Sequence, residues 1–186
     1  QVMYDEIAKL GGVPVMWKTG HSLIKARMKE LKAAMAGEMS GHIFFADKWF
    51  GFDDAVYSTC RVLEIVAKER VKDEGFAFSS MLAGIAETVV TPEIRIECPD
   101  DLKFELIKKL DAAIGSGGDG FKIRDIIRID GLRVNFEGGW ALVRASNTQP
   151  VLVLRFEAND QATLDRAKAF MKAKLEAVRP GETVSF

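Results

Sequence analysis

The feature that most constrains the fold is residues 140–156, in which two apolar segments flank a short polar loop at residues 144–150. Upstream, the dipeptide Asp130-Gly131 separates apolar runs at residues 126–129 and 132–136. An Asp-Gly pair between two such runs is a strong signal for a β-hairpin. Since Gly138-Gly139 then turns the chain again, residues 126–156 are predicted to form an antiparallel meander.

Helical patterns surround this meander and complete a compact unit. Residues 93–98 alternate in polarity, as a half-buried strand does. Two helices follow from apolar residues at helical spacing, and the second has Asn159 or Asp160 as its N-cap. The first helix carries Leu102, Leu106, Leu110 and Ile114, and the second carries Leu164, Ala167, Met171 and Leu175. Residues 91–186 are therefore predicted to form an α+β domain.

Residues 1–90 show a different pattern, which predicts an α/β domain. The apolar run at residues 13–17 reads as a buried strand, and apolar residues from Ile24 to Met35 recur at helical spacing. His21 would then lie at a strand-to-helix junction, where ligands collect in α/β sheets. A second helix is expected at about residues 56–70, with Asp53 or Asp54 as its N-cap.

The polar loop of the meander has the composition of an anion site. Arg144 offers a forked and permanently charged donor, while Ser146, Asn147 and Thr148 offer hydroxyl and amide groups. A tight turn can also aim several backbone N–H groups at one point. The alternative is an ordinary hairpin turn that is polar because turns are polar.

A second polar turn lies at residues 37–42. In an extended segment, Glu38, Ser40 and His42 would project to the same side. A carboxylate and a hydroxyl can hold adjacent sugar hydroxyls, and a histidine can exchange a proton near neutral pH. The alternative is a loop with a solvated glutamate and a hydrogen-bonded histidine. A zinc site is less favoured, because His21 and His42 lack ligand spacing and no third ligand is evident, so no metal ligand is assigned.

Composition narrows the possible partners. The net charge is −1, so no long-range field draws the chain to nucleic acid or to an anionic membrane. No apolar run reaches the ~20 residues that span a bilayer. Two cysteines, Cys60 and Cys98, are expected to be core thiols in a reducing compartment, which indicates a cytoplasmic protein. The chain opens on Gln1 instead of a methionine, so we expect a piece of a longer protein.

Three stretches in one order carry a family resemblance: residues 19–22 (Thr-Gly-His-Ser), 37–42 (Gly-Glu-Met-Ser-Gly-His) and 144–150 (Arg-Ala-Ser-Asn-Thr-Gln-Pro). Together they resemble the C-terminal half of the α-D-phosphohexomutases, most closely their bacterial phosphomannomutase/phosphoglucomutase branch. The resemblance implies an incomplete third domain of α/β type at residues 1–90. It also implies a fourth domain at residues 91–186, with a sheet of the TATA-binding-protein-like type.

The resemblance further implies an isomerase that moves phosphate between the 1- and 6-oxygens of a hexose through a phosphoserine and a bisphosphorylated sugar. Glu38 and Ser40 would hold two ring hydroxyls that mannose and glucose share. His21 and His42 would line the site of transfer, with His42 as a candidate for proton transfer. The phosphate that does not react would be held by Arg144, Ser146, Asn147 and Thr148.

The resemblance assigns the remaining parts to N-terminal domains of the same polypeptide. These include the phosphoserine and the Mg²⁺ loop, so this chain alone is expected to be inactive even with a glucose 1,6-bisphosphate-type activator. Hinge motion is expected about residues 89–91. The alternatives are a non-catalytic phosphosugar-binding module and, less favoured by charge, a nucleic-acid-binding sheet.

Overall fold

The computed structural model describes residues 1–115, 122–181 and 184–186. Contacts between residues divide the chain into two units, residues 1–86 and residues 87–186. This division lies four residues before the predicted domain boundary.

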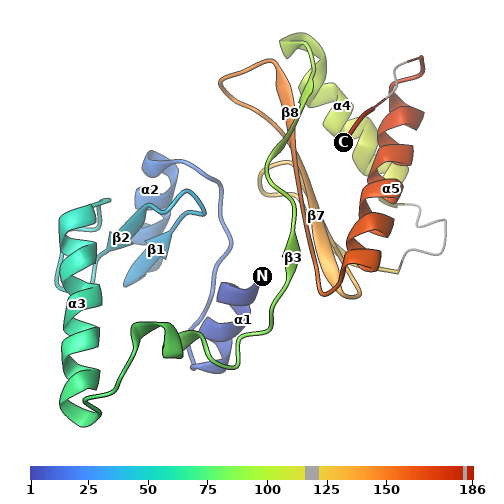
Figure 1. Ribbon diagram of the computed structural model, residues 1–186. Coiled ribbons are helices and arrows are strands. Elements are labelled where there is room, and N and C mark those ends of the chain that lie inside the picture. The colour runs from blue at the N-terminus through green and yellow to red at the C-terminus, as the bar shows by residue number, and fades with distance from the viewer. Residues whose placement is uncertain (116–121, 182–183) are drawn as a thin grey trace. The chain divides into compact units, whose positions relative to one another are not determined.

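The second unit is built on an antiparallel sheet of six strands (Figure 1). Their order is β3-β8-β7-β6-β5, and β4 also pairs with β8. The strands are β3 (Val89–Val90), β4 (Ile94–Glu97), β5 (Ile123–Ile127), β6 (Leu132–Phe136), β7 (Gly139–Ala145) and β8 (Val151–Ala158). The meander expected from the turn signals is therefore confirmed, since β5, β6, β7 and β8 are joined in sequence as antiparallel neighbours.

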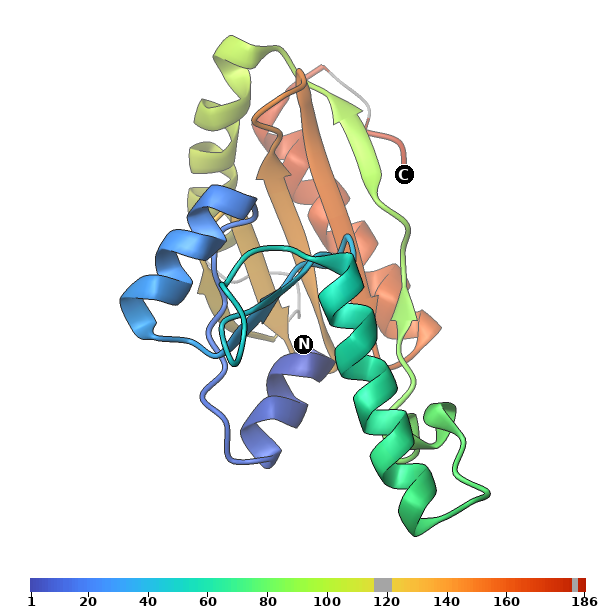
Figure 2. The same cartoon turned by 90° about the vertical axis from the view of Figure 1, so that its left-hand side faces the viewer.

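Two helices cover one face of this sheet, as the views in Figures 1 and 2 agree. They are α4 (Asp100–Gly115) and α5 (Gln161–Val178). Fully buried side chains fill the space between helices and sheet, among them Leu110, Leu154, Phe156, Met171 and Leu175. The helix-flanked antiparallel sheet predicted from the alternation of apolar residues is confirmed, because that alternation places one face of each strand against the helices.

The predicted core-facing side of α4 is wrong at its first residue, Leu102. Leu102 is 47% exposed, whereas its neighbour Lys103 is only 4% exposed. Leu106, Leu110 and Ile114 do face the core as predicted. The aliphatic part of a lysine can be buried like a leucine when its ammonium finds oxygen acceptors. For Lys103 these include two backbone carbonyls of the loop between β7 and β8.

The first unit is smaller and more open. Its helices are α1 (Val2–Lys9), α2 (His21–Leu31) and α3 (Ala55–Lys72), with a short 3₁₀ helix, η1 (Phe78–Leu82). Strands β1 (Met35–Gly37) and β2 (Ile43–Phe45) form an antiparallel hairpin. Its buried core consists of Ile24, Met28 and Phe44, with Ala33 and Ala36 packed against them.

Two predictions for this unit are wrong. Residues 12–18 form no strand, and the side chains of Val13 and Val15 are 89% and 50% exposed, because no neighbouring strand among the described residues pairs with them. Helix α2 ends at Leu31, where Lys32 adopts a left-handed conformation with φ of 52°. Met35 consequently lies in β1 and not on the helix.

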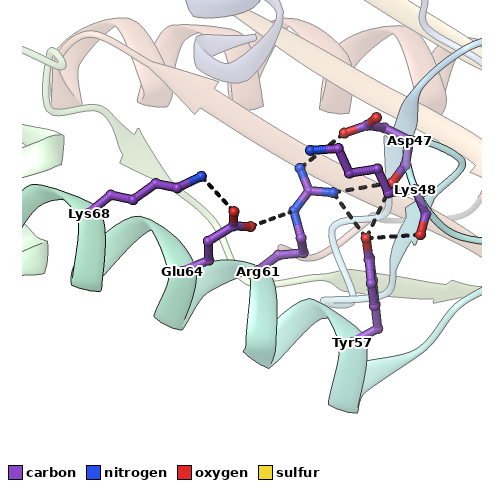
Figure 3. A network of polar contacts seen from close by, with 6 residues as sticks. All are labelled: Asp47, Lys48, Tyr57, Arg61, Glu64 and Lys68. Atoms are coloured by element: carbon purple, nitrogen blue, oxygen red, sulfur yellow. Dashed lines mark hydrogen bonds and ion pairs between the residues drawn. The ribbon is translucent and has the colours of Figure 1, made fainter.

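Helix α3 begins as predicted, with Asp54 as its N-cap accepting from the Tyr57 N–H at 2.9 Å. Side chains of α3 also hold the loop that follows β2 (Figure 3). Arg61 donates to the Asp47 carboxylate and backbone carbonyl, both at 3.2 Å, and the Tyr57 hydroxyl donates to the carbonyls of Asp47 and Lys48. This network fixes the segment that leads into Asp53.

Three further expectations meet different outcomes. Cys98 is buried as predicted, but Cys60 is exposed on α3 and is not a core thiol. The hinge expected about residues 89–91 stays a prediction. In the structure, Val89 and Val90 pair with β8, and the Thr91 hydroxyl accepts from the Phe156 N–H at 3.1 Å. Within the described ranges, we find no helix with the length and apolarity that crossing a bilayer requires.

Candidate functional site

The turn between β1 and β2 brings Glu38 and His42 together. The Glu38 N–H donates to the His42 carbonyl at 2.9 Å, and the Gly41 N–H donates to the Glu38 carbonyl at 3.0 Å. The prediction that residues 38–42 are extended is therefore wrong, since they form the tight end of a hairpin. Ser40 lies in this turn and is exposed.

His21 joins the same turn from the first residue of α2. Its Nε2 lies 3.8 Å from Oε2 of Glu38, and its ring meets the His42 ring edge to face, with centroids 4.5 Å apart. One potential ligand atom from each of His21, Glu38 and His42 lies within 4.8 Å of the others. We call these three residues the His–Glu–His cluster. Residues 1–20 form no strand, so the strand-to-helix junction predicted at His21 is wrong, and His21 meets the hairpin turn instead.

Glu38 is the most enclosed member of the cluster. Its side chain is 8% exposed, whereas those of His21 and His42 are 48% and 44% exposed. The backbone N–H of Gly20 donates to Oε1 of Glu38 at 2.8 Å. Gly20 has φ of 132°, a conformation that favours glycine. One carboxylate oxygen is thus held by the backbone, and the other faces His21.

Asp53 orients His42 from the far side of the ring. Its Oδ2 lies 2.6 Å from Nδ1 of His42, and its Oδ1 accepts from the Ile43 N–H at 3.2 Å. Burial on its own raises the pKa of the Asp53 carboxyl, but the hydrogen bonds from His42 and Ile43 outweigh it, so the pKa lies below its ordinary value. An ionised Asp53 accepts a hydrogen bond from Nδ1–H of His42 and leaves the other ring nitrogen, Nε2, available for chemistry.

Asp53 was expected only as a possible helix cap, so its role at the cluster was missed. The signal was present, because Asp53-Asp54 supplies two carboxylates and a helix needs only one at its N-cap. Asp54 takes the cap, and Asp53 forms a bridge with Phe44 in β2 that turns its side chain toward His42.

In the second unit, the predicted loop at residues 144–150 comprises the last two residues of β7 and the turn that connects β7 to β8. Arg144, the penultimate residue of β7, is one quarter exposed, and its Nη1 lies 3.8 Å from Oδ2 of Asp130. That distance leaves a weak ion pair, so the guanidinium keeps donors for another anion. Asn147 and Thr148 are exposed at the tip of the loop.

Ser146 is only 7% exposed and organises the loop from inside. Its hydroxyl accepts from the N–H groups of Thr148 and Gln149 at 3.3 and 3.2 Å. These two N–H groups therefore point at Ser146, which differs from the expectation that they point outward at an anion. Both bonds are long and leave the hydroxyl hydrogen free to donate.

Lys103, which sequence reasoning assigned no role, supports the loop from beneath. Its ammonium donates to the backbone carbonyls of Ser146 and Gln149 at 2.5 and 3.2 Å and to the Asp100 carboxylate at 2.6 Å. No local signal marks its role at the loop, because the two carbonyl groups lie more than 40 residues away in the sequence.

A separate groove of about 750 Å³ lies in the first unit between α2 and the loop after β2. Its lining includes Lys25, Lys29, Phe50 and Phe52, and none of the predicted site residues belongs to it. Volume alone gives it no defined chemistry, whereas the His–Glu–His cluster has convergent polar groups.

Comparison with protein-family models gives two matches. Residues 1–87 match the model of the phosphoglucomutase/phosphomannomutase alpha/beta/alpha domain III, and residues 93–174 match that of the phosphoglucomutase/phosphomannomutase C-terminal domain. Together the two models account for most of the chain.

Individual relatives agree with these models. The phosphomannomutase/phosphoglucomutase of Pseudomonas aeruginosa is 49% identical over 182 residues, which cover 97% of this chain and 37% of the relative. A phosphoglucomutase of Neisseria gonorrhoeae is 44% identical over 172 residues, which cover 92% of this chain and 35% of that relative. The crystal structure of a phosphoglucomutase/phosphomannomutase family protein from Burkholderia thailandensis is similar with a TM-score of 0.84 at 41% identity, over 99% of this chain and 37% of that one. The chain thus spans little more than a third of the length of these relatives.

Proposed function

This chain belongs to the phosphoglucomutase/phosphomannomutase family, and we propose that it forms the sugar- and phosphate-recognising part of a cytoplasmic phosphomannomutase/phosphoglucomutase. The activity is that of an isomerase, which interconverts hexose 1-phosphate and hexose 6-phosphate. The observation that carries the proposal is the hairpin turn that unites Glu38 and His42 with His21, because it assembles a carboxylate and two imidazoles at one exposed point.

Sugar recognition is the role of the turn at residues 38–42. The Glu38 carboxylate is held by the Gly20 N–H through Oε1, so Oε2 can accept from a ring hydroxyl without reorganising. The exposed hydroxyl of Ser40 can donate to or accept from the adjacent sugar hydroxyl. These hydroxyls are common to mannose and glucose, so the turn serves both sugars.

Proton transfer is the role of His42, with His21 beside it. Asp53 accepts from Nδ1 of His42, whose side chain is 44% exposed, and leaves Nε2 available. A histidine held in one tautomer by a carboxylate can take a proton from an attacking hydroxyl and return it later. Phosphoryl transfer otherwise depends on position and on charge stabilisation, which these side chains supply at the sugar end.

Phosphate recognition is the role of the loop at residues 144–150. Arg144 provides the charge, and Ser146, Asn147 and Thr148 provide neutral donors around it. Binding a phosphate that does not react supplies binding energy remote from the reacting oxygen. Such a loop can serve both orientations of a bisphosphorylated sugar, since either phosphate presents the same oxygens.

The family also implies Mg²⁺ and a phosphoserine. Mg²⁺ prefers oxygen ligands in octahedral geometry, and the His–Glu–His cluster offers two nitrogens and one carboxylate, so these residues do not fit it. Mg²⁺ and the phosphoserine therefore belong to other parts of the longer polypeptide, and no step at this cluster uses Mg²⁺.

The experiment is Arg144→Ala in the full-length protein, assayed as a mutase with Mg²⁺ and a glucose 1,6-bisphosphate activator. A charge-assisted hydrogen bond is worth about 1.5–3 kcal/mol, so kcat/KM should fall about 10- to 100-fold, mainly through KM. Arg128→Ala is the matched control, because Arg128 makes two 2.7 Å bonds to Asp111 and none to the loop at residues 144–150. Unchanged kinetic constants for Arg144→Ala would remove the phosphate role.

The isolated chain separates the enzyme from a non-catalytic phosphosugar-binding module. We expect no mutase turnover from the chain alone, even with the activator and Mg²⁺. If the full-length protein also lacks turnover but still binds glucose 1-phosphate, the binding-module alternative is correct. Binding of a DNA duplex in place of glucose 1-phosphate would contradict both.

A further inference from the structure

The His–Glu–His cluster has a second property that sugar recognition does not require. Its three members each offer a metal-ligating atom, and these atoms lie within 4.8 Å of one another. In a tetrahedral site with bonds of about 2.0 Å, ligand atoms lie about 3.3 Å apart. His21 and His42 are nearly half exposed, so small rotations of either ring can close that difference.

Two of the three cluster residues are held in place by hydrogen bonds of the kind that orient metal ligands. Asp53 accepts from Nδ1 of His42 at 2.6 Å, which leaves the Nε2 lone pair free to coordinate. Metal-bound histidines almost always donate their other N–H to a carboxylate or carbonyl in this way. The Gly20 N–H fixes Oε1 of Glu38 at 2.8 Å, and Oε2 then faces His21. Two of the three ligands are thus oriented before any ion arrives.

The donor set selects the kind of ion. Two imidazole nitrogens and one carboxylate oxygen suit Zn²⁺ and neighbouring transition metals, whereas Mg²⁺ and Ca²⁺ prefer oxygen alone. Three protein ligands leave the fourth tetrahedral position open to water. The exposure of both histidine rings gives an ion access from solvent.

We propose that His21, Glu38 and His42 bind one Zn²⁺ ion, with Asp53 as the positioning residue for His42. Zinc binding itself does not depend on the function proposed above. If that function is also correct, Zn²⁺ and a hexose phosphate compete for Glu38, and zinc acts as an inhibitor.

The test is a titration of the purified chain, free of any histidine tag, with Zn²⁺ by calorimetry and with Co²⁺ by visible absorption. We expect one ion per chain and the bands of four-coordinate Co²⁺. His21 and His42 are the only histidines in the sequence. Their imidazole C–H signals in NMR should therefore both move with one equivalent of Zn²⁺.

Variants separate this site from adventitious binding. His21→Ala, His42→Ala and Glu38→Gln should each lose the stoichiometric site. Asp53→Asn should weaken binding about 10- to 100-fold while leaving all three ligands in place. Cys60→Ser and Glu30→Gln are the controls, because Cys60 is an exposed thiol and Glu30 is a carboxylate on α2 whose side chain is 64% exposed and pairs with Arg27. Neither control should change the affinity.

Several results would overturn the proposal. Binding that disappears in Cys60→Ser would assign the ion to the thiol. Zn²⁺ shifts confined to one imidazole, or equal affinity in Asp53→Asn and the unaltered chain, would remove the cluster as a site. The NMR spectrum of each variant reports whether it is folded. In Glu38→Gln the side-chain oxygen can still accept from the Gly20 N–H, so loss of zinc binding in that variant reports the lost ligand and not a change of fold.

Discussion

The ammonium of Lys103 lies 2.5 Å from the backbone carbonyl oxygen of Ser146. It also donates to the carbonyl of Gln149 at 3.2 Å. One side chain from α4 therefore bonds to the residues on either side of the exposed tip, Asn147 and Thr148. Lys103 is only 4% exposed, and its third partner is Asp100 on its own helix. The loop proposed to bind phosphate is therefore held from below by a buried charge on α4.

Replacing Lys103 by methionine should destabilise the second unit. The substitution keeps the buried aliphatic part but leaves the buried carbonyl of Ser146 without the ammonium as donor, which costs roughly 1–3 kcal/mol in the free energy of unfolding. The Gln149 carbonyl still accepts from the Val151 N–H at 2.8 Å. Chemical denaturation measures this difference. In the full-length protein the same variant should raise KM, because the loop is no longer held in its binding conformation.

Lys109→Met is the matched control for that prediction. Lys109 lies on the same helix and pairs with Glu105, but its side chain is 60% exposed and touches no loop carbonyl. Exposed pairs of this kind contribute little to stability. If the two substitutions change the free energy of unfolding and KM equally, the hydrogen bonds from Lys103 to the loop do not stabilise it.

The sequence predicted the second unit well because its signals are local. The alternation of strands 94–97, 132–136 and 151–158 and the Asp130-Gly131 turn determine which neighbours pair. The position of Lys103 could not be predicted in this way. A lysine beside a row of leucines looks like a solvated residue, and only the fold brings the carbonyls of Ser146 and Gln149 to it.

The first unit was predicted less well for a related reason. An apolar run such as residues 13–17 reads as a strand, but a strand needs a neighbour to pair with. The composition of residues 37–42 did indicate a polar site, although the hairpin that assembles it was missed. Hairpin pairing depends on where β2 begins, and the glycines at 37 and 41 allow either an extended or a turned path.

Gly131→Ala should disturb the backbone beneath Arg144. Gly131 has φ of 81°, and an added Cβ would lie 2.4 Å from the Val143 carbonyl oxygen and 2.7 Å from Cα of Arg144. Backbone atoms of a central strand cannot move aside easily, so we expect a loss of stability beyond the left-handed conformational cost of about 1–2 kcal/mol. Chemical denaturation measures the loss.

Gly138→Ala is the control, because it isolates the cost of the conformation. Gly138 turns the chain between β6 and β7 with φ of 90°, yet a Cβ there meets only a methyl group of Thr163 at 3.4 Å. The difference between the two alanine variants then measures the clash at Arg144. If Gly131→Ala is no more destabilising than Gly138→Ala, the backbone of β7 at Val143 and Arg144 moves aside at little cost, and the predicted clash is wrong.

Asp160 gives the second unit a predictable dependence on pH. Its carboxylate caps α5, accepting from the Thr163 N–H at 2.7 Å and from the Thr163 hydroxyl at 2.9 Å. The backbone hydrogen bond from Thr163, followed by that from its hydroxyl, lowers the pKa of Asp160. A carboxyl whose pKa is lower in the folded state contributes stability above its unfolded pKa, and that contribution is lost as the pH falls through the folded value.

Asp160→Asn should remove this dependence while keeping a side chain that can still cap the helix. The difference in free energy of unfolding between the unaltered chain and Asp160→Asn should be constant above about pH 5 and shrink below about pH 4. Asp165→Asn, one turn further along α5, tests whether any aspartate on the helix has the same effect; Asp165 accepts only from the Gln161 side chain in an exposed pair. A difference for Asp160→Asn that stays constant down to about pH 3 would mean that the charge on the cap does not stabilise α5.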